Sequence, residues 1–128
     1  NNEEDCDLLL FTHGAITLEC IKAANILDES GIKISVCSVL QVKPIPQYAI
    51  KICSNQKHII CVEEHSTYHS VGSSLLQSIS GNGHCGKFKI FGIEDVFTEV
   101  VGSRDFLLKH HGIDGQSLAS RIILELDH

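Results

Sequence analysis

Titratable side chains follow directly after the most apolar short run of the chain. Residues 59–62 read Ile-Ile-Cys-Val, and Glu63-Glu64-His65 comes next. The β-branched run predicts a strand buried on both faces, as in a parallel sheet covered by helices. A carboxylate beside an imidazole can act as general acid and base when a substrate lies near. We favour the alternative, in which one carboxylate caps the following turn and the others face a neighbouring surface.

Two further patterns could indicate binding sites. Residues 81–86 (Gly-Asn-Gly-His-Cys-Gly) match the letters of the dinucleotide fingerprint, but they end a predicted helix and open a strand, the reverse of the required order. We therefore interpret these glycines as a helix C-cap and a turn. His65 and His69, with Cys61 and Glu64, could be drawn as a metal site, but they more naturally occupy a strand-to-helix loop, and no second ligand pair occurs.

The sequence contains neither a Gly-x-Ser-x-Gly nucleophile elbow nor a phosphate-binding P-loop. Nothing in it assembles into an active site of its own. We expect no catalytic, cofactor-binding or metal-binding residue in this chain.

Composition narrows the class of protein. Residues 1–128 are expected to form a single domain. The net charge of −6 and the lack of a Lys/Arg cluster argue against nucleic acid. No apolar run approaches the roughly 20 residues that span a bilayer, and the acidic start, residues 1–5, does not resemble a targeting peptide. Six irregularly spaced cysteines without a CxxC pair indicate reduced thiols and a cytoplasmic protein.

Strands and helices alternate along the chain. The predicted strands are residues 6–12, 32–40, 59–62 and 88–91. The predicted helices are residues 17–30, 46–53, 71–80, 103–111 and 116–126, and residues 93–97 are predicted to be a loop or a single turn. This alternation predicts an α/β fold with three α/β/α layers and a mainly parallel sheet of four strands. In the second predicted strand, residues 32–40, apolar and polar residues partly alternate, which suggests that this strand lies near an edge of the sheet.

The first helix has a clear pattern. Leu18, Ile21, Ala24 and Leu27 fall at helical spacing and predict one buried stripe. Thr17 is the expected N-cap, and Gly31 the expected stop.

Eight short motifs follow one another along the chain: Asp7 through Gly14, Ala23-Ala24 to Gly31-Ile32 with Leu27, Lys43-Pro44-Ile45, Val62-Glu63-Glu64-His65-Ser66, Val71-Gly72-Ser73, Phe91 to Phe97, Gly102-Ser103, and His111-Gly112-Ile113-Asp114. In this order they resemble the C-terminal domain of transketolase-type thiamin diphosphate enzymes. This group includes transketolase, 1-deoxyxylulose-5-phosphate synthase and the β-subunits of 2-oxoacid dehydrogenases. Two positions depart from the family pattern: His69-Ser70 replaces Gly-Gly, and Glu94 replaces a proline.

The resemblance implies a strand order of 2-1-3-4. It also implies a structural and dimer-forming domain of a transketolase-like enzyme that moves two-carbon ketol units between sugar phosphates. Thiamin diphosphate and Mg²⁺ would be held by N-terminal domains or a separate N-terminal subunit, so this chain, a fragment or a subunit, would be inactive alone. The family loop facing the rest of the enzyme would contain Gly14, Glu63, Glu64, His65, Gly72 and Ser73. The family's domain also has an antiparallel strand just before the position of Asp5, so we expect an exposed edge on the second strand.

Three alternatives remain open. The chain could belong to a 1-deoxyxylulose-5-phosphate synthase, or to a 2-oxoacid dehydrogenase β-subunit with a lipoyl-carrying partner. It could also be an independent regulatory module that holds a small anion above Glu63, His65 and His13-Gly14.

Overall fold

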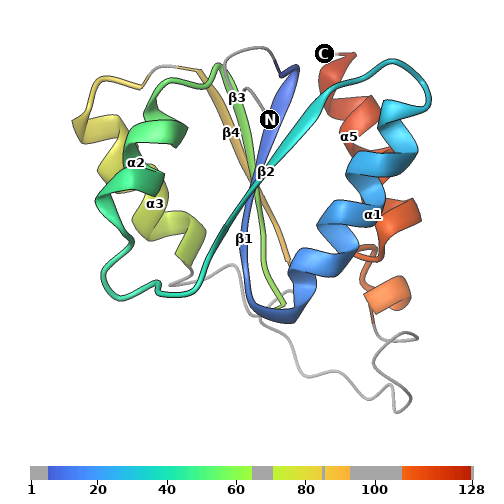
Figure 1. The fold of residues 1–128 in the computed structure, drawn as a ribbon, viewed down its shortest axis with the longest axis horizontal. Helices are drawn as coiled ribbons and strands as arrows, with labels where there is room; N and C mark the ends of the chain where they lie inside the picture. Colours follow the sequence, from blue (N-terminus) through green and yellow to red (C-terminus); the bar gives the residue numbers. More distant parts are fainter. Residues whose placement is uncertain (1–5, 65–70, 85, 93–107, 128) are drawn as a thin grey trace.

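Four parallel strands form the centre of the molecule. The computed structural model describes residues 6–64, 71–84, 86–92 and 108–127. The strands are β1 (Leu8–His13), β2 (Ile34–Val39), β3 (His58–Val62) and β4 (Lys87–Phe91), and they pair in the order β2-β1-β3-β4 (Figure 1). The predicted strand order 2-1-3-4 is confirmed.

Helices cover both faces of the sheet. They are α1 (Thr17–Asp28), α2 (Gln47–Ser54), α3 (Val71–Gly81) and α5 (Gly115–Leu126), with a short 3-10 helix η2 (Gly14–Ile16) before α1. Helices α1 and α5 lie on one face, and α2 and α3 lie on the other (Figure 1). The predicted three layers are therefore present. The expected helix over residues 103–111 and the loop over 93–97 fall mainly outside the described residues.

The core has two halves, one on each face of the sheet. Leu8 and Leu10 of β1 pack towards α1 and α5, whereas Leu9 and Phe11 pack towards α2 and α3. All four are fully buried. Successive side chains of a strand point to opposite faces, so a central strand covered on both sides must be apolar throughout. This is why β1 reads as an unbroken apolar run.

Helix α1 turns a different face inward from the one that its apolar spacing predicted. Leu18 is 63% exposed and Ile21 is 43% exposed, so the predicted stripe is wrong at these positions. The buried face is Glu19, Cys20, Ala23 and Leu27. Helix α1 packs against α5 as well as against the sheet. Because it contacts both neighbours, its buried face includes Glu19 in addition to apolar residues.

The start of α1 also differs from the prediction. Thr17 is not the N-cap, because η2 precedes it and the residue in the cap position, Ile16, has no capping side chain. The Thr17 hydroxyl instead forms a hydrogen bond of 2.9 Å with the hydroxyl of Ser38 on β2. The predicted stop at Gly31 is confirmed: Gly31 has a φ of +80°, and the next N–H, that of Ile32, donates back to the Leu27 carbonyl.

The buried glutamate of α1 stabilises the start of α5. One oxygen of Glu19 accepts a hydrogen bond of 2.9 Å from the Gly115 N–H, and the other lies 3.1 Å from the ammonium group of Lys22. Asp114 occupies the N-cap position of α5 but makes no capping bond, and its Oδ1 is buried without a partner. A Cβ on Gly115 would lie 2.6 Å from the Cβ of Lys22. Glu19 and Gly115 together therefore allow α1 and α5 to pack closely.

The two edges of the sheet differ in charge. Within the described ranges, no strand pairs with the outer edge of β2, and residues 34–40 carry no charge. The other edge strand, β4, exposes Lys87 and Lys89. Lysines on an edge strand discourage pairing with another chain. Of the two edges, β2 is the one suited to accept a further strand.

Across the part of the chain that the structure covers, no helix has the length and apolarity needed to cross a bilayer.

We expect Glu19→Ala to lower the free energy of unfolding by about 1–3 kcal/mol, because the buried Gly115 N–H would lose its acceptor. Urea denaturation monitored by circular dichroism measures the change. The matched control is Glu29→Ala at the exposed C-terminal end of the same helix, which we expect to stay within about 0.5 kcal/mol of the parent. Equal effects of the two substitutions would contradict the assigned role.

Candidate functional site

The residues singled out by the sequence lie where β3 ends. Glu63 directly follows the last residue of β3 and is 1% exposed. Its N–H donates a hydrogen bond of 2.9 Å to the carbonyl of Phe91, the last residue of β4. The backbone of Glu63 thus continues the ladder between β3 and β4. This places its side chain at the carboxyl edge of the sheet, where ligands bind in open α/β folds.

The Glu63 carboxylate caps helix α3. Its Oε1 accepts a hydrogen bond of 3.0 Å from the Val71 N–H, and its Oε2 accepts one of 3.2 Å from the Gly72 N–H. A carboxylate is favourable at a helix N-terminus because it satisfies free N–H groups and matches the helix dipole. Glu63 is therefore the capping carboxylate that the sequence pattern favoured. Both of its oxygens are engaged, which disfavours a role as general base.

Gly72 provides the space for this carboxylate. A Cβ at this position would lie 2.8 Å from the Ile90 side chain and 3.1 Å from Glu63 Oε2. Packing thus explains the glycine in the Val71-Gly72-Ser73 motif, because a larger residue at position 72 would push helix α3 away from the carboxylate that caps it.

The other described residues of the predicted loop follow β1 or β3, or lie in the first turn of α3. Glu64 is half-buried and Ser73 is exposed. Gly14 is exposed and begins η2 with a φ of +76°, which favours glycine. His65 lies outside the described residues. Of the described positions in this loop, the structure brings Glu63 and Gly72 into direct contact.

The glycine-rich stretch after α3 ends the helix, as predicted. Gly83 has a φ of +88°, and the His84 N–H donates a hydrogen bond of 3.0 Å to the Ile79 carbonyl. This is the pattern of a helix C-cap. A Cβ on Gly86 would lie 2.2 Å from the Lys57 carbonyl oxygen, so this glycine permits the close approach of the β3 and β4 starts.

The buried thiols are poorly suited to nucleophilic chemistry. Cys6, Cys20, Cys37, Cys53 and Cys61 are all free, as predicted for them, and Cys85 lies outside the described residues. Burial raises the pKa of the Cys20 thiol to about 12. Burial also raises the pKa of Cys61 well above its ordinary value. Because the thiolate is the reactive form, these groups are inert at neutral pH.

The described residues do not fit Mg²⁺ or another metal ion. Within residues 6–64, 71–84, 86–92 and 108–127, no three histidine, cysteine or acidic side chains are grouped so that they could hold a metal. Mg²⁺ requires several oxygen ligands in near-octahedral geometry. The buried carboxylates of Glu19 and Glu63 already accept backbone N–H groups.

Sequence reasoning missed Arg121. Its guanidinium lies 3.8 Å from the centre of the Phe91 ring and donates a hydrogen bond of 2.9 Å to the Gly112 carbonyl. Burial lowers the pKa of Arg121, although an arginine remains charged at neutral pH. Arg121 therefore ties α5 and the turn before it to β4. No local motif marks this role, because its partners lie far away in the sequence.

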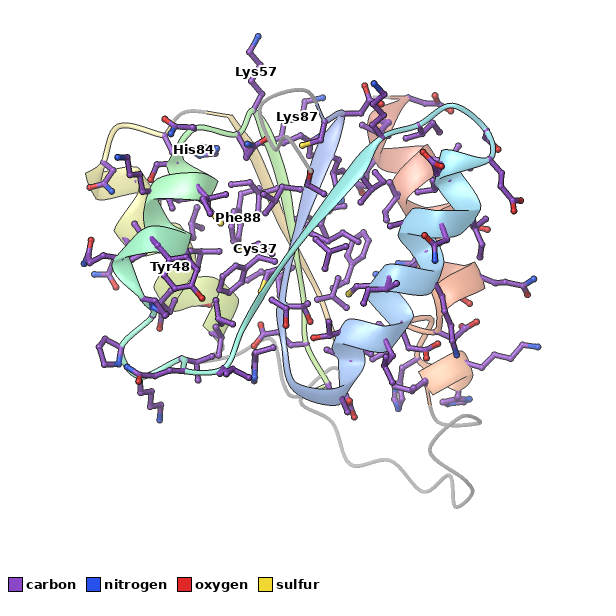
Figure 2. All side chains as sticks on the ribbon, in the orientation of Figure 1. Cys37, Tyr48, Lys57, His84, Lys87 and Phe88 are labelled. Atoms are coloured by element: carbon purple, nitrogen blue, oxygen red, sulfur yellow. The ribbon has the colours of Figure 1, made fainter. Side chains whose placement is uncertain are left out.

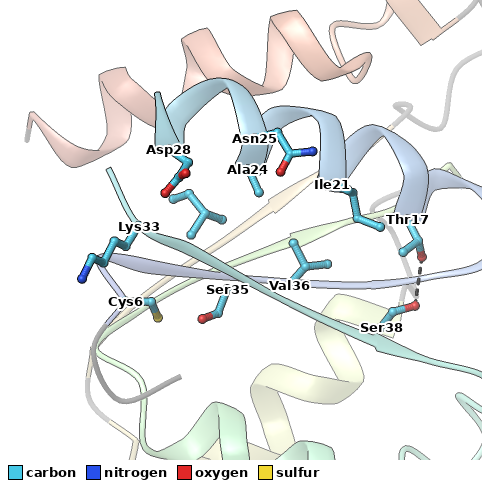
Figure 3. A pocket seen from close by; sticks show the side chains of 11 residues that line it. Cys6, Thr17, Ile21, Ala24, Asn25, Asp28, Lys33, Ser35, Val36 and Ser38 are labelled. Carbon is cyan, nitrogen blue, oxygen red and sulfur yellow. Dashed lines mark hydrogen bonds between the residues drawn. The ribbon is translucent and has the colours of Figure 1, made fainter. Parts of the chain in front are cut away.

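A groove lies away from this edge, between α1 and β2. It has a volume of about 670 Å³, and its walls include Ile21 and Ala24 of α1 and Val36 of β2 (Figure 3). The hydrogen bond between Thr17 and Ser38 lies at one end. The exposed stripe of α1 thus continues into the unpaired edge of β2.

We expect Gly72→Ala to destabilise the domain by roughly 1–3 kcal/mol, because the added methyl group would crowd Ile90 and the capping carboxylate. Gly81→Ala in the same helix is the control, since its Cβ meets nothing within 4 Å. We expect this control to change stability by no more than about 1 kcal/mol. Thermal and urea unfolding of both variants would test this, and a neutral Gly72→Ala would refute the close approach.

The chain matches a protein-family model over nearly its whole length. The model is that of the transketolase C-terminal domain, and it matches residues 2–118. The chain is 35% identical to a putative transketolase C-terminal section of Methanocaldococcus jannaschii over 120 residues. These residues are 94% of this chain and 37% of that protein. It is 35% identical over 115 residues to one subunit of the apulose-4-phosphate transketolase of Actinobacillus succinogenes, covering 87% of this chain and 36% of that protein.

More distant similarities agree. A 1-deoxy-D-xylulose-5-phosphate synthase of Streptomyces griseus is 28% identical over 116 residues, which are 91% of this chain and 18% of the enzyme. Among solved structures, a split gene transketolase described as an inactive beta4 tetramer superimposes with a TM-score of 0.81 at 23% identity, covering 94% of this chain and 39% of that one. Transketolase from Campylobacter jejuni superimposes with a TM-score of 0.67 at 21% identity, over 96% of this chain and 17% of that one.

The two structural likenesses concern the fold alone, and the chain spans little more than a third of the first two relatives. The family model nevertheless matches most of the chain, and the fold agrees with it. The chain therefore belongs to the transketolase C-terminal domain family.

Proposed function

We propose that this chain is the C-terminal domain, or a separate C-terminal subunit, of a transketolase-like enzyme that transfers two-carbon ketol units between sugar phosphates. The observation that carries the proposal is the 35% identity to a transketolase C-terminal section over 94% of the chain. Identity to the matched 1-deoxy-D-xylulose-5-phosphate synthase is lower, at 28%. This difference favours the transketolase branch of the family.

In this proposal the domain has a structural role. Thiamin diphosphate and Mg²⁺ are bound by N-terminal domains or a partner subunit, and the full enzyme is a cytoplasmic homodimer. The engagement of Glu19 and Glu63 with the protein's own backbone supports this division. The family loop around Glu63 and Gly72 then has its shape fixed by capping rather than by a ligand.

The same contacts disfavour the alternative of an anion-binding module. The free N–H groups at a helix N-terminus attract anions. At α3 and α5, the carboxylates of Glu63 and Glu19 already accept such groups. A phosphate at either N-terminus would have to displace a buried carboxylate.

We propose that the rest of the enzyme docks on the groove between α1 and β2. Ile21 is exposed on the wall of this groove, and strand β2 contains no lysine, whereas β4 exposes Lys87 and Lys89. The larger part of the first two matched relatives lies outside the matched region. An extended segment from the thiamin diphosphate-binding part could add to β2 and cover the apolar stripe.

The division of labour predicts that this chain neither binds thiamin diphosphate in calorimetry nor converts xylulose 5-phosphate. Adding the thiamin diphosphate-binding part of the same enzyme should restore ketol transfer to an aldose phosphate acceptor. A thermal-shift screen with sugar phosphates and nucleotides should leave the melting temperature of this chain unchanged. Micromolar binding of thiamin diphosphate would overturn the division, and a sugar-phosphate shift would favour the anion module.

The docking surface is tested by Ile21→Lys, which places a charge on the wall of the groove. The control is Ile26→Lys on the same helix, because Ile26 is similarly exposed, at 38%, but does not line the groove. We expect Ile21→Lys to weaken reconstitution at least about tenfold, as for a buried interface residue. Ile26→Lys should reconstitute like the parent. Equal behaviour of the two folded variants would place the interface elsewhere.

A further inference from the structure

Cations gather along the edge strand β4, although the sequence itself contains no run of lysines and arginines. Lys87, Lys89 and Phe91 occupy alternate positions of β4. Because successive side chains of a strand point to opposite faces, these three share one face of the sheet. Phe91 packs in the core under α1 and α5, so the two exposed lysines lie on the side of α5. Figure 2 shows Lys87 at the end of the sheet where β4 begins.

A cleft of about 220 Å³ lies between β4 and α5. Its walls include Lys89 and Phe91 of the strand, and Arg121, Leu124 and Glu125 of the helix. The Lys89 ammonium group lies 2.7 Å from the Glu125 carboxylate, and the Leu124 side chain is 61% exposed. The cleft therefore combines two cations, one carboxylate and an accessible apolar side chain.

The Arg121 guanidinium is held in a fixed orientation within this cleft. It lies 3.8 Å from the centre of the Phe91 ring, and one of its N–H groups donates a hydrogen bond of 2.9 Å to the Gly112 carbonyl. Among the described residues, no other group accepts a hydrogen bond from it. An arginine has five N–H donors in a planar fork that matches a carboxylate. Because the fork is already oriented, binding a carboxylate would cost little side-chain entropy.

We propose that this cleft binds an acidic peptide segment, with one carboxylate on Arg121 and a second on the lysines of β4. Arg121 lies over Phe91, which is two residues beyond Lys89 along the strand. Two residues of a strand span about 6–7 Å, and carboxylates two positions apart in an extended peptide have the same spacing. The partner is therefore an extended segment with acidic residues at positions i and i+2. An apolar neighbour in that segment would cover Leu124.

The charges around the cleft favour a carboxylate over a phosphate group. Glu125 lines the same cleft and repels any anion that enters it. A phosphate group carries up to twice the charge of a carboxylate and is repelled more strongly. The net charge of −6 also opposes a long polyanion such as nucleic acid. A peptide can instead place single negative charges next to separate cations.

This surface is independent of the groove between α1 and β2, because β2 and β4 form opposite edges of the described sheet. The lysines of β4 discourage backbone pairing with another strand. We therefore expect side-chain contacts in the cleft to hold the acidic segment. An acidic partner and the rest of the enzyme can consequently bind the chain at the same time.

The test is a titration of the isotope-labelled full chain with the acetylated and amidated peptide Gly-Leu-Glu-Ser-Glu-Leu-Gly, followed by NMR at low salt. Chemical-shift changes should concentrate on residues 87–91 and 121–125, and added salt should weaken binding. The same peptide with glutamine in place of both glutamates should bind about tenfold more weakly. Changes confined to other elements, or none at millimolar peptide, would overturn the proposal.

Matched variants test the cleft itself. Lys89→Glu should weaken peptide binding about fivefold or more, because a repulsive charge replaces a cation. Lys51→Glu is the control, since it makes the same charge change at an exposed position of α2, on the other face of the sheet. It should bind the peptide within about twofold of the parent. Equal weakening by both variants would show that only net charge matters and would contradict the site.

Glu125→Gln gives a readout of opposite sign. Removing the carboxylate should strengthen peptide binding about twofold or more, whereas the glutamine oxygen can still accept from Lys89. A purely structural role of the pair would produce no such gain. Circular dichroism verifies that the variants are folded, and Glu125→Gln decides the question if Lys89→Glu fails to fold.

Inorganic phosphate separates the two kinds of anion. At equal concentration it should shift the signals of residues 87–91 and 121–125 less than the peptide does. Binding of phosphate as tight as that of the peptide would assign the cleft to phosphate groups and overturn the proposal.

Discussion

Buried carboxylates that accept backbone N–H groups across the core are the interaction on which this architecture depends. Glu63 caps α3 from the end of β3, and Glu19 caps α5 from the first turn of α1. In each case a side chain from one element satisfies the first N–H groups of another. An ionised carboxylate is costly to bury unless hydrogen bonds compensate it. Each glutamate therefore fixes the position of the helix it caps as well as its start.

These caps also determine what the carboxyl edge of the sheet can do. In many α/β proteins, helix N-termini at this edge bind phosphate groups. Here the N–H groups of Val71, Gly72 and Gly115 already have internal acceptors. At α3 and α5, carboxylates of the protein itself therefore occupy the place that a bound anion takes in those proteins.

The exposed surface between α1 and β2 complements this closed edge. Leu18 and Ile21 lie outside the core although their spacing is that of a buried stripe. A helix with apolar residues on two faces commonly contacts something on each. Helix α1 uses its inner face for the sheet and α5, and its outer apolar face adjoins the unpaired strand edge.

The sequence by itself determined the strands, their parallel pairing and the stops of the helices, and the family resemblance supplied the strand order. Apolar runs such as residues 59–62 form strands, and glycines such as Gly31 end helices, through interactions with residues nearby in the chain. Both signals can therefore be recognised in a single sequence. The family motifs likewise indicated the family, and Glu63 could be interpreted as a cap because α3 follows it closely. Only the tertiary structure decided which face of α1 is buried, because Glu19 gains its partner, Gly115, from a distant part of the chain. The contact of Arg121 with Phe91 was hidden for the same physical reason. Local spacing sets what an element can bury, and its neighbours in three dimensions set what it does bury.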